Sequence, residues 1–75
     1  MMLQILWFIY DKDTWMTATK IAKHLDRPVS SVSSVLLKMT LDGRLRRKKG
    51  VGPLGGFGYN ITPRGWRIIE ERSQR

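Results

Sequence analysis

The stretch that most constrains this chain lies near its middle, at residues 27–43 (RPVSSVSSVLLKMTLDG). Apolar side chains recur there at the 3.6-residue period of a helix, which predicts a buried face. That predicted face consists of Val29, Val32, Val35, Leu36 and Met39. The opposite face carries Ser30, Ser34, Leu37, Lys38 and Leu41. Pro28 suits a first helical position, and Gly43 suits the left-handed residue just past a helix end. We therefore expect a helix over residues 28–42.

A second helix is predicted immediately upstream, over residues 17–25 (TATKIAKHL). Thr17 is a suitable N-cap, and Ile21, Ala22 and Leu25 form the inner stripe. Two or three residues separate this helix from the next. Such spacing is typical of a helix-turn-helix, in which the second helix enters the major groove of DNA.

The N-terminal helix, predicted over residues 2–11, is apolar on more than one side. Leu3, Leu6, Trp7 and Tyr10 share one face, while other apolar residues occupy much of the remainder. A surface helix of a monomer usually has one apolar stripe. Two explanations stay open: a central core helix, or a homodimer contact through helix 2–11.

The segments that flank the two central helices follow strand and turn patterns. Trp15-Met16 is a short extended piece, and we expect Trp15 to pack in the core or at a hinge rather than to stack on bases. Residues 45–49 and 57–61 are predicted strands, joined by the glycine-rich loop GVGPLGG at residues 50–56. Thr62 and Pro63 start a last helix, with Trp66 and Ile69 directed inward.

The chain as a whole has 75 residues, so we expect one domain over residues 1–75. It contains no cysteine, which excludes disulfides and thiolate metal sites and is compatible with the cytoplasm. Its 14 basic against 6 acidic residues give a net charge of +8, which favours a polyanionic partner. The apolar opening MMLQILWFIY is too short to span a membrane and lacks signal-peptide features, so no membrane partner is expected.

Between residues 17 and 71 the chain resembles winged helix-turn-helix transcriptional regulators. TATKIAKHL followed by VSSVSSVLLKMTLDGRLRR is similar to their helix 2, helix 3 and strand 2, and YNITPRGWRIIEE to the strand 3 and helix 4 segment of MarR-type and PadR-type members. The short length is similar to PapI-like fimbrial regulators. The resemblance implies an α+β fold with a three-helix core, a C-terminal β-hairpin wing at residues 44–61 and a final helix.

This resemblance implies a regulator that binds double-stranded DNA, although the same fold also serves as a protein-interaction module in larger assemblies. The turn Leu25-Asp26-Arg27-Pro28 also resembles domains that bind Z-form nucleic acids. Those domains have an asparagine where this chain has Ser33 and a tyrosine where it has Leu37, which argues against that subfamily.

If the family's binding mode applies, helix 28–42 lies in the major groove. Its candidate DNA contacts are Ser30, Ser31, Ser33, Ser34 and Lys38. Serine lacks the bidentate geometry of arginine, asparagine or glutamine, so direct base readout should be weak and DNA shape should contribute. The alternative is a small, solvated helix face.

The strongest electrostatic signal is a basic run, five cations in six positions. It consists of Arg44, Arg46, Arg47, Lys48 and Lys49, of which the last four are expected to contact DNA. Strand side chains alternate, so the five cannot all face one way. The alternative is a solvated strand whose charges prevent edge pairing.

Further candidates lie at the start of helix 17–25, where exposed amides favour a phosphate. These are Thr17, Thr19 and Lys20, with Lys23, Arg64 and Arg67 as secondary candidates. Leu37 and Leu41 are unexpected on an outer face; they would contact thymine methyls, lie under the wing or bind a protein partner.

An enzyme is not expected from these residues. The chain has one histidine, His24, and its carboxylates are scattered without the spacing of a metal site or of a nucleophile with its base. We therefore expect no catalytic residue, no metal and no cofactor.

Overall fold

The helices and strands follow one another in the order that the sequence predicts: helix, short strand, two helices, hairpin, helix. A computed structural model describes residues 1–52 and 55–73, the side chains of residues 72 and 73 excepted. The elements are α1 (Met2–Lys12), β1 (Met16–Thr17), α2 (Ala18–Leu25), α3 (Val29–Leu41), β2 (Leu45–Val51), β3 (Gly56–Ile61) and α4 (Pro63–Ser73). The predicted loop is shorter than expected because residues 50, 51 and 56 join the strands. Pro53 and Leu54, in the same predicted loop, lie outside the described residues.

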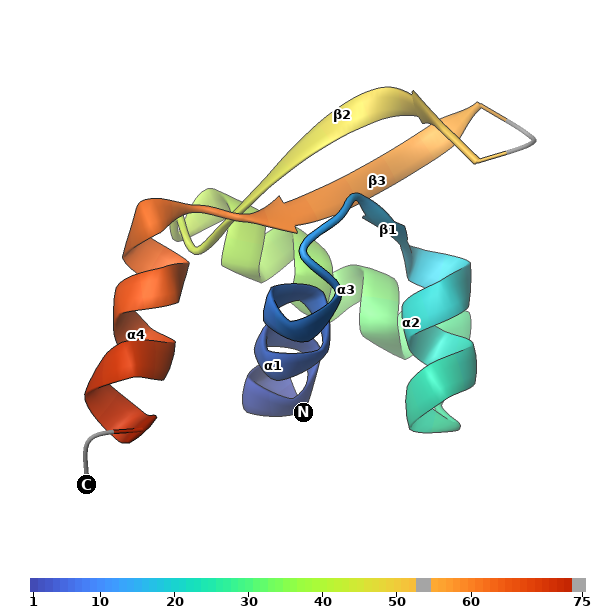
Figure 1. Cartoon of the computed structure of the whole chain (residues 1–75). Coiled ribbons are helices and arrows are strands. Elements are labelled where there is room, and N and C mark those ends of the chain that lie inside the picture. Colours follow the sequence, from blue (N-terminus) through green and yellow to red (C-terminus); the bar gives the residue numbers. More distant parts are fainter. Residues whose placement is uncertain (53–54, 74–75) are drawn as a thin grey trace.

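The strands form an antiparallel sheet of order β1-β3-β2, so β2 and β1 are its edges. In the described part of the chain, the helices lie on one side of this sheet, and the β2–β3 hairpin extends beyond them (Figure 1). The register pairs Tyr59 with both Met16 and Arg47. The fold class is therefore α+β, as predicted.

The core lies between the helices and the helix side of the sheet. Three α3 residues contribute most directly: Val32, Leu36 and Met39 are completely buried. They pack with buried residues of every other helix and of the sheet, namely Ile5, Leu6, Ile9, Met16, Ile21, Ala22, Leu45, Tyr59 and Ile69. Burying each large apolar side chain stabilises the fold by about 1.5–3 kcal/mol, so the shared core fixes α3 against α1 and α2.

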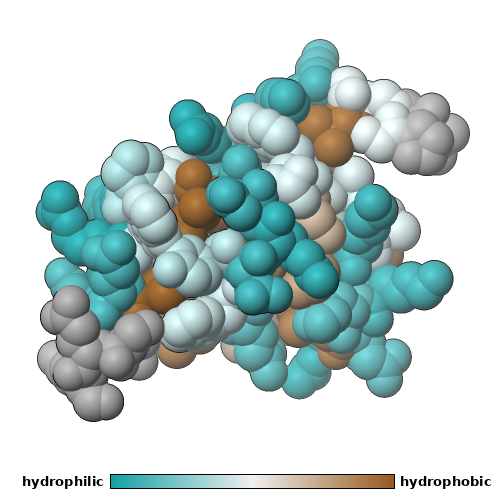
Figure 2. Space-filling view, in the orientation of Figure 1, coloured by the Kyte–Doolittle hydropathy of each residue, from teal (hydrophilic) through white to brown (hydrophobic). Residues whose placement is uncertain are grey.

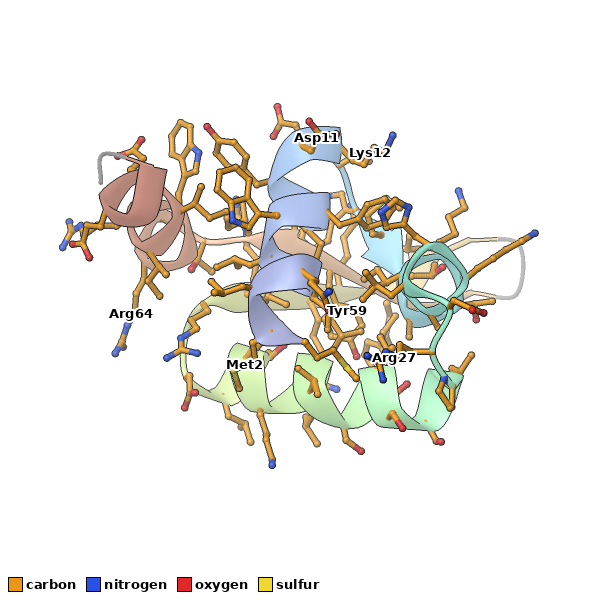
Figure 3. The ribbon with its side chains drawn as sticks, turned by 90° about the horizontal axis from the view of Figure 1, so that it is seen from below. Met2, Asp11, Lys12, Arg27, Tyr59 and Arg64 are labelled. Carbon is orange, nitrogen blue, oxygen red and sulfur yellow. The ribbon has the colours of Figure 1, made fainter. Side chains whose placement is uncertain are left out.

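α1 lies in the middle of the helical layer, between α2 and α4 (Figure 1, Figure 3). On one side Phe8 stacks on His24 of α2, with ring centroids 3.9 Å apart. On the other side Tyr10 contacts Trp66 of α4, with centroids 6.0 Å apart. Aromatic contacts therefore link α1 to both neighbouring helices.

The end of α3 is fixed by a Schellman motif. The Arg44 N–H donates to the Met39 carbonyl at 2.9 Å, and the Gly43 N–H donates to the Thr40 carbonyl at 3.1 Å. Gly43 has φ +80°, a conformation that costs glycine little because it has no Cβ. The predicted helix end at this glycine is confirmed.

Thr62 ties this turn to the start of α4. Its hydroxyl donates to the Gly43 carbonyl at 2.5 Å, and its backbone N–H donates to the Arg44 carbonyl at 3.2 Å. The Thr62 hydroxyl oxygen also accepts from the Gly65 N–H at 3.2 Å, which is the predicted N-cap contact. One threonine thus joins the α3–β2 turn to α4.

Two predicted burial positions are wrong. Val29 is 45% exposed because it lies in the first turn of α3, next to the exposed turn at residues 26–28. Trp66 is 48% exposed although its ring contacts Tyr10 of α1. On α1 the buried residues are Ile5, Leu6 and Ile9, whereas Leu3 and Trp7 are exposed. Pro28 precedes α3 instead of starting it.

We predict that Gly65→Ala destabilises the protein although alanine favours helices by about 1 kcal/mol over glycine. A Cβ at this position would overlap the Arg44 carbonyl oxygen and press on Ile61. We expect a net loss of about 1–3 kcal/mol in the free energy of unfolding, measured by urea denaturation. Gly56→Ala is the matched control, because no atom lies within 4 Å of its Cβ position. Equal stability of the two variants would contradict the close approach of α4 to this turn.

Candidate nucleic-acid interface

The outward face of α3 is the first part of the candidate interface. Because Val32, Leu36 and Met39 are buried, the residues on the opposite side of the helix are held toward solvent. The exposed residues there are Ser30, Ser31, Ser34, Leu37, Lys38 and Leu41, and Ser33 is half-buried. α3 runs along one side of the molecule, so this face is open along its length (Figure 3).

The serines on this face keep hydrogen-bonding capacity. The Ser34 hydroxyl donates to the Ser30 carbonyl at 3.1 Å, a bond within the helix. A hydroxyl that donates in this way still presents acceptor lone pairs outward. Short side chains also allow the helix backbone to approach a binding partner closely.

The hairpin separates its cations onto two faces. Arg47 is opposite Tyr59, whose side chain is buried in the core, so Arg47 and Lys49 lie on the helix side of the sheet. Arg46 is opposite Asn60 and Lys48 is opposite Gly58, which places both on the other side. Hydrophilic side chains project along the hairpin in the view of Figure 2. The four predicted strand contacts are therefore two pairs with opposite orientations.

Each pair of cations shares an aromatic ring. On the helix side, Arg47 Cζ lies 4.5 Å and Lys49 Nζ 5.9 Å from the Phe57 ring centroid. On the other side, Lys48 Nζ lies 4.5 Å and Arg46 Cζ 6.0 Å from the Trp15 ring centroid. Exposed cation–π contacts contribute about 0.5–1 kcal/mol, enough to orient a side chain but too little to prevent its transfer to a phosphate.

The position of Trp15 differs from the expectation. The side chain is half-buried, and it is neither one of the buried core residues nor one of those packed against the core. It precedes β1 on the sheet face that is opposite the helices. Its partners are 31 and 33 positions away in the sequence, and no local pattern could indicate them. Phe57 could have been found, because it alternates with Tyr59 and shares its face.

A groove joins α2, α3 and the helix side of the hairpin. It is lined by Thr17, Ala18, Thr19, Ser33, Val51, Gly52, Gly56, Phe57 and Tyr59. Three predicted contacts, Thr17, Thr19 and Ser33, therefore lie together beside the ring that carries Arg47. The Thr17 hydroxyl oxygen accepts from the Lys20 N–H at 3.3 Å, which confirms the predicted cap of α2.

Three further cations lie in different places. Arg44 is half-buried, and its Nη1 donates to Met2 Sδ at 3.4 Å, so it belongs to the packing of α1. Arg64 lies beside Gly43 and projects toward the side of the molecule that carries α3 (Figure 3). Arg27 is exposed in the turn between α2 and α3, and sequence reasoning did not include it among the contacts.

The described residues form neither a metal cluster nor a membrane-spanning helix. No group of three or more histidine, cysteine, aspartate or glutamate side chains is placed to share a metal ion. None of the described helices has the length and apolar character needed to cross a membrane.

Comparison with known proteins gives a fold match. No protein-family model matches the chain, and no curated protein does. Among solved structures, one from Methanosarcina mazei Go1, described as a possible transcriptional regulator, matches with a TM-score of 0.71 and 23% identity over 95% of this chain. The present chain spans 62% of that protein's chain. This likeness shows that the two share a fold.

The cap of α2 gives a testable prediction for the groove. Thr17→Ala removes the acceptor for the Lys20 N–H and should lower the free energy of unfolding by about 1 kcal/mol, measured by thermal denaturation. Thr17→Ser keeps the hydroxyl and should retain most of that stability. If the two variants lower the free energy of unfolding equally, the lost methyl group explains the effect and the hydroxyl cap contributes nothing to stability.

Proposed function

We propose that this chain is a winged-helix transcriptional regulator that binds double-stranded DNA, with α3 in the major groove and the β2–β3 hairpin as the wing. One observation carries the proposal. The buried stripe of α3 holds a serine and lysine face outward, and the groove that Ser33 lines also contains Phe57, over whose ring Arg47 and Lys49 lie. The description of the Methanosarcina mazei protein as a possible transcriptional regulator also favours a regulatory role.

The two parts of this surface supply different kinds of contact. Ser30, Ser33 and Ser34 are short donors and acceptors, which fit close to base edges but do not select one base strongly. Lys38 and the helix-side cations Arg47 and Lys49 reach phosphates, which set register and affinity. We therefore propose strong electrostatic binding with modest sequence preference, supplemented by recognition of DNA shape.

A protein-interaction module is the second candidate, and it also has a specific observation in its favour. Leu41 is 78% exposed, and Leu37 and Val29 are exposed on the same helix. Apolar side chains on an outer helix face suit a protein partner better than a phosphate backbone. The net charge of +8 favours DNA.

We predict that binding to random duplex DNA falls steeply with salt. About six phosphate contacts give a slope of roughly −5 in a plot of log K against log salt concentration. Lys38→Gln and Arg47→Gln should each make the slope shallower by about 0.9, because each removes one contact. Fluorescence anisotropy over a salt series measures this.

Lys12→Gln is the control for charge alone. Lys12 lies at the end of α1 that points away from α3 (Figure 3), so this variant should keep the wild-type slope. A slope near zero for the wild-type protein, together with a co-purifying protein partner, would favour the interaction module instead.

We also propose that the α1 surface pairs two copies of this chain. Trp7 is 42% exposed next to Tyr10, with Leu3 and Trp66 exposed nearby on α1 and α4. An aromatic strip of this kind is enriched in protein interfaces. Sedimentation equilibrium should give a mass above the 8.7 kDa of the chain, and Trp7→Glu should return it to that value. A monomer at high concentration would contradict this pairing.

A further inference from the structure

We propose that the sheet face opposite the helices binds an unpaired nucleic-acid strand, with a base stacked on Trp15 and phosphates held by Arg46 and Lys48. This site is separate from the duplex surface and does not depend on it. Trp15, Arg46 and Lys48 form one cluster on this face, with both cations over the indole ring. An aromatic ring beside cations on a sheet face is the arrangement that single strands favour, because bases stack while phosphates follow the positive charges.

The face is accessible to such a ligand. Within the described residues, the helices all lie on the other side of the sheet (Figure 1). Arg46 and Lys48 are exposed, and Trp15 is half-buried, so the indole is held in place while part of its ring remains open. The cross-strand neighbours of Arg46 and Lys48 are Asn60 and Gly58, and the Val51 side chain occupies the space that a Cβ at Gly58 would take. The exposed part of the indole ring is therefore where a base would stack.

An exchange of partners makes binding favourable. In the free protein the Lys48 ammonium lies 4.5 Å from the Trp15 centroid, where the contact is weak because both groups face solvent. Base–aromatic stacking is stronger than such an exposed cation–π contact. A base that takes the ring therefore releases Lys48 to a phosphate, and the ammonium gains a charge-assisted partner.

The chemistry selects an unpaired strand over a duplex. A base in a duplex is stacked on its neighbours and cannot offer a face to Trp15, whereas an unpaired base can. Nearby carboxylates limit the site on one side: Asp11 and Asp13 line a groove with Arg46, Tyr10 and Trp66. Their charges repel phosphates, so the strand lies on the Trp15–Lys48 side and continues toward the hairpin.

The experiment measures the affinity of the protein for an oligothymidylate of about ten nucleotides by fluorescence anisotropy. Its affinity for random duplex DNA is measured in parallel. Trp15→Leu keeps an apolar side chain but removes the stacking ring, and it should weaken oligothymidylate binding about tenfold while leaving duplex affinity unchanged. Arg46→Gln with Lys48→Gln should make the single-strand salt slope shallower by about 1.4. Arg47→Gln with Lys49→Gln is the matched control on the other face and should mainly affect the duplex.

A second readout reports the stacking itself. The chain has three tryptophans, so Trp7→Phe with Trp66→Phe leaves Trp15 as the single fluorophore. Oligothymidylate should quench its emission. Absence of quenching, or equal losses of single-strand affinity from the two double cation variants, would overturn the proposal even if Trp15→Leu fails to fold. If the wild-type protein binds duplex DNA but not oligothymidylate, only the single-strand site is overturned. If it binds oligothymidylate but not duplex DNA, only the proposed regulator function is contradicted.

Discussion

The burial of one stripe of α3 is the constraint on which the remaining arrangement depends. Val32, Leu36 and Met39 have no exposed surface, and they pack against α1, α2 and the sheet. A helix fixed in this way has its opposite face fixed as well, since the two faces are set by the same 3.6-residue period. Thr62 then bonds the turn after α3 to the start of α4, so the strand that follows leaves in a defined direction. These two restraints hold the hairpin next to α3, where Ser33 and Phe57 line one groove.

Much of the fold could be predicted because its signals are local. The helix end at Gly43 and the caps at Thr17 and Thr62 depend on residues within one turn, and all three are as predicted. Burial was predicted less well, since periodicity identifies an apolar face but not the neighbour that covers it. Val29 lies beyond the packed part of α3, and Trp66 contacts Tyr10 of α1 but remains about half exposed.

The candidate site was predictable in its composition more than in its geometry. Strand alternation already implied that the basic run would divide between two faces, and buried Leu45 marks Arg47 as the helix-side residue. The sequence could not indicate that Arg46 and Lys48 lie over the Trp15 ring, because that contact depends on β3 pairing with both β1 and β2. The role of each predicted contact in binding stays a prediction.

The central claim is that the outer face of α3 and the helix side of the hairpin act as one surface for duplex DNA. The most direct test is a titration of ¹⁵N-labelled protein with a short random duplex, followed through the backbone amide resonances. The account predicts that the largest shifts fall in α3 at residues 30–38, in β2 at Arg47 and Lys49, and at Thr19. Shifts confined to α1 and α4, with the α3 amides unchanged at saturation, would contradict it.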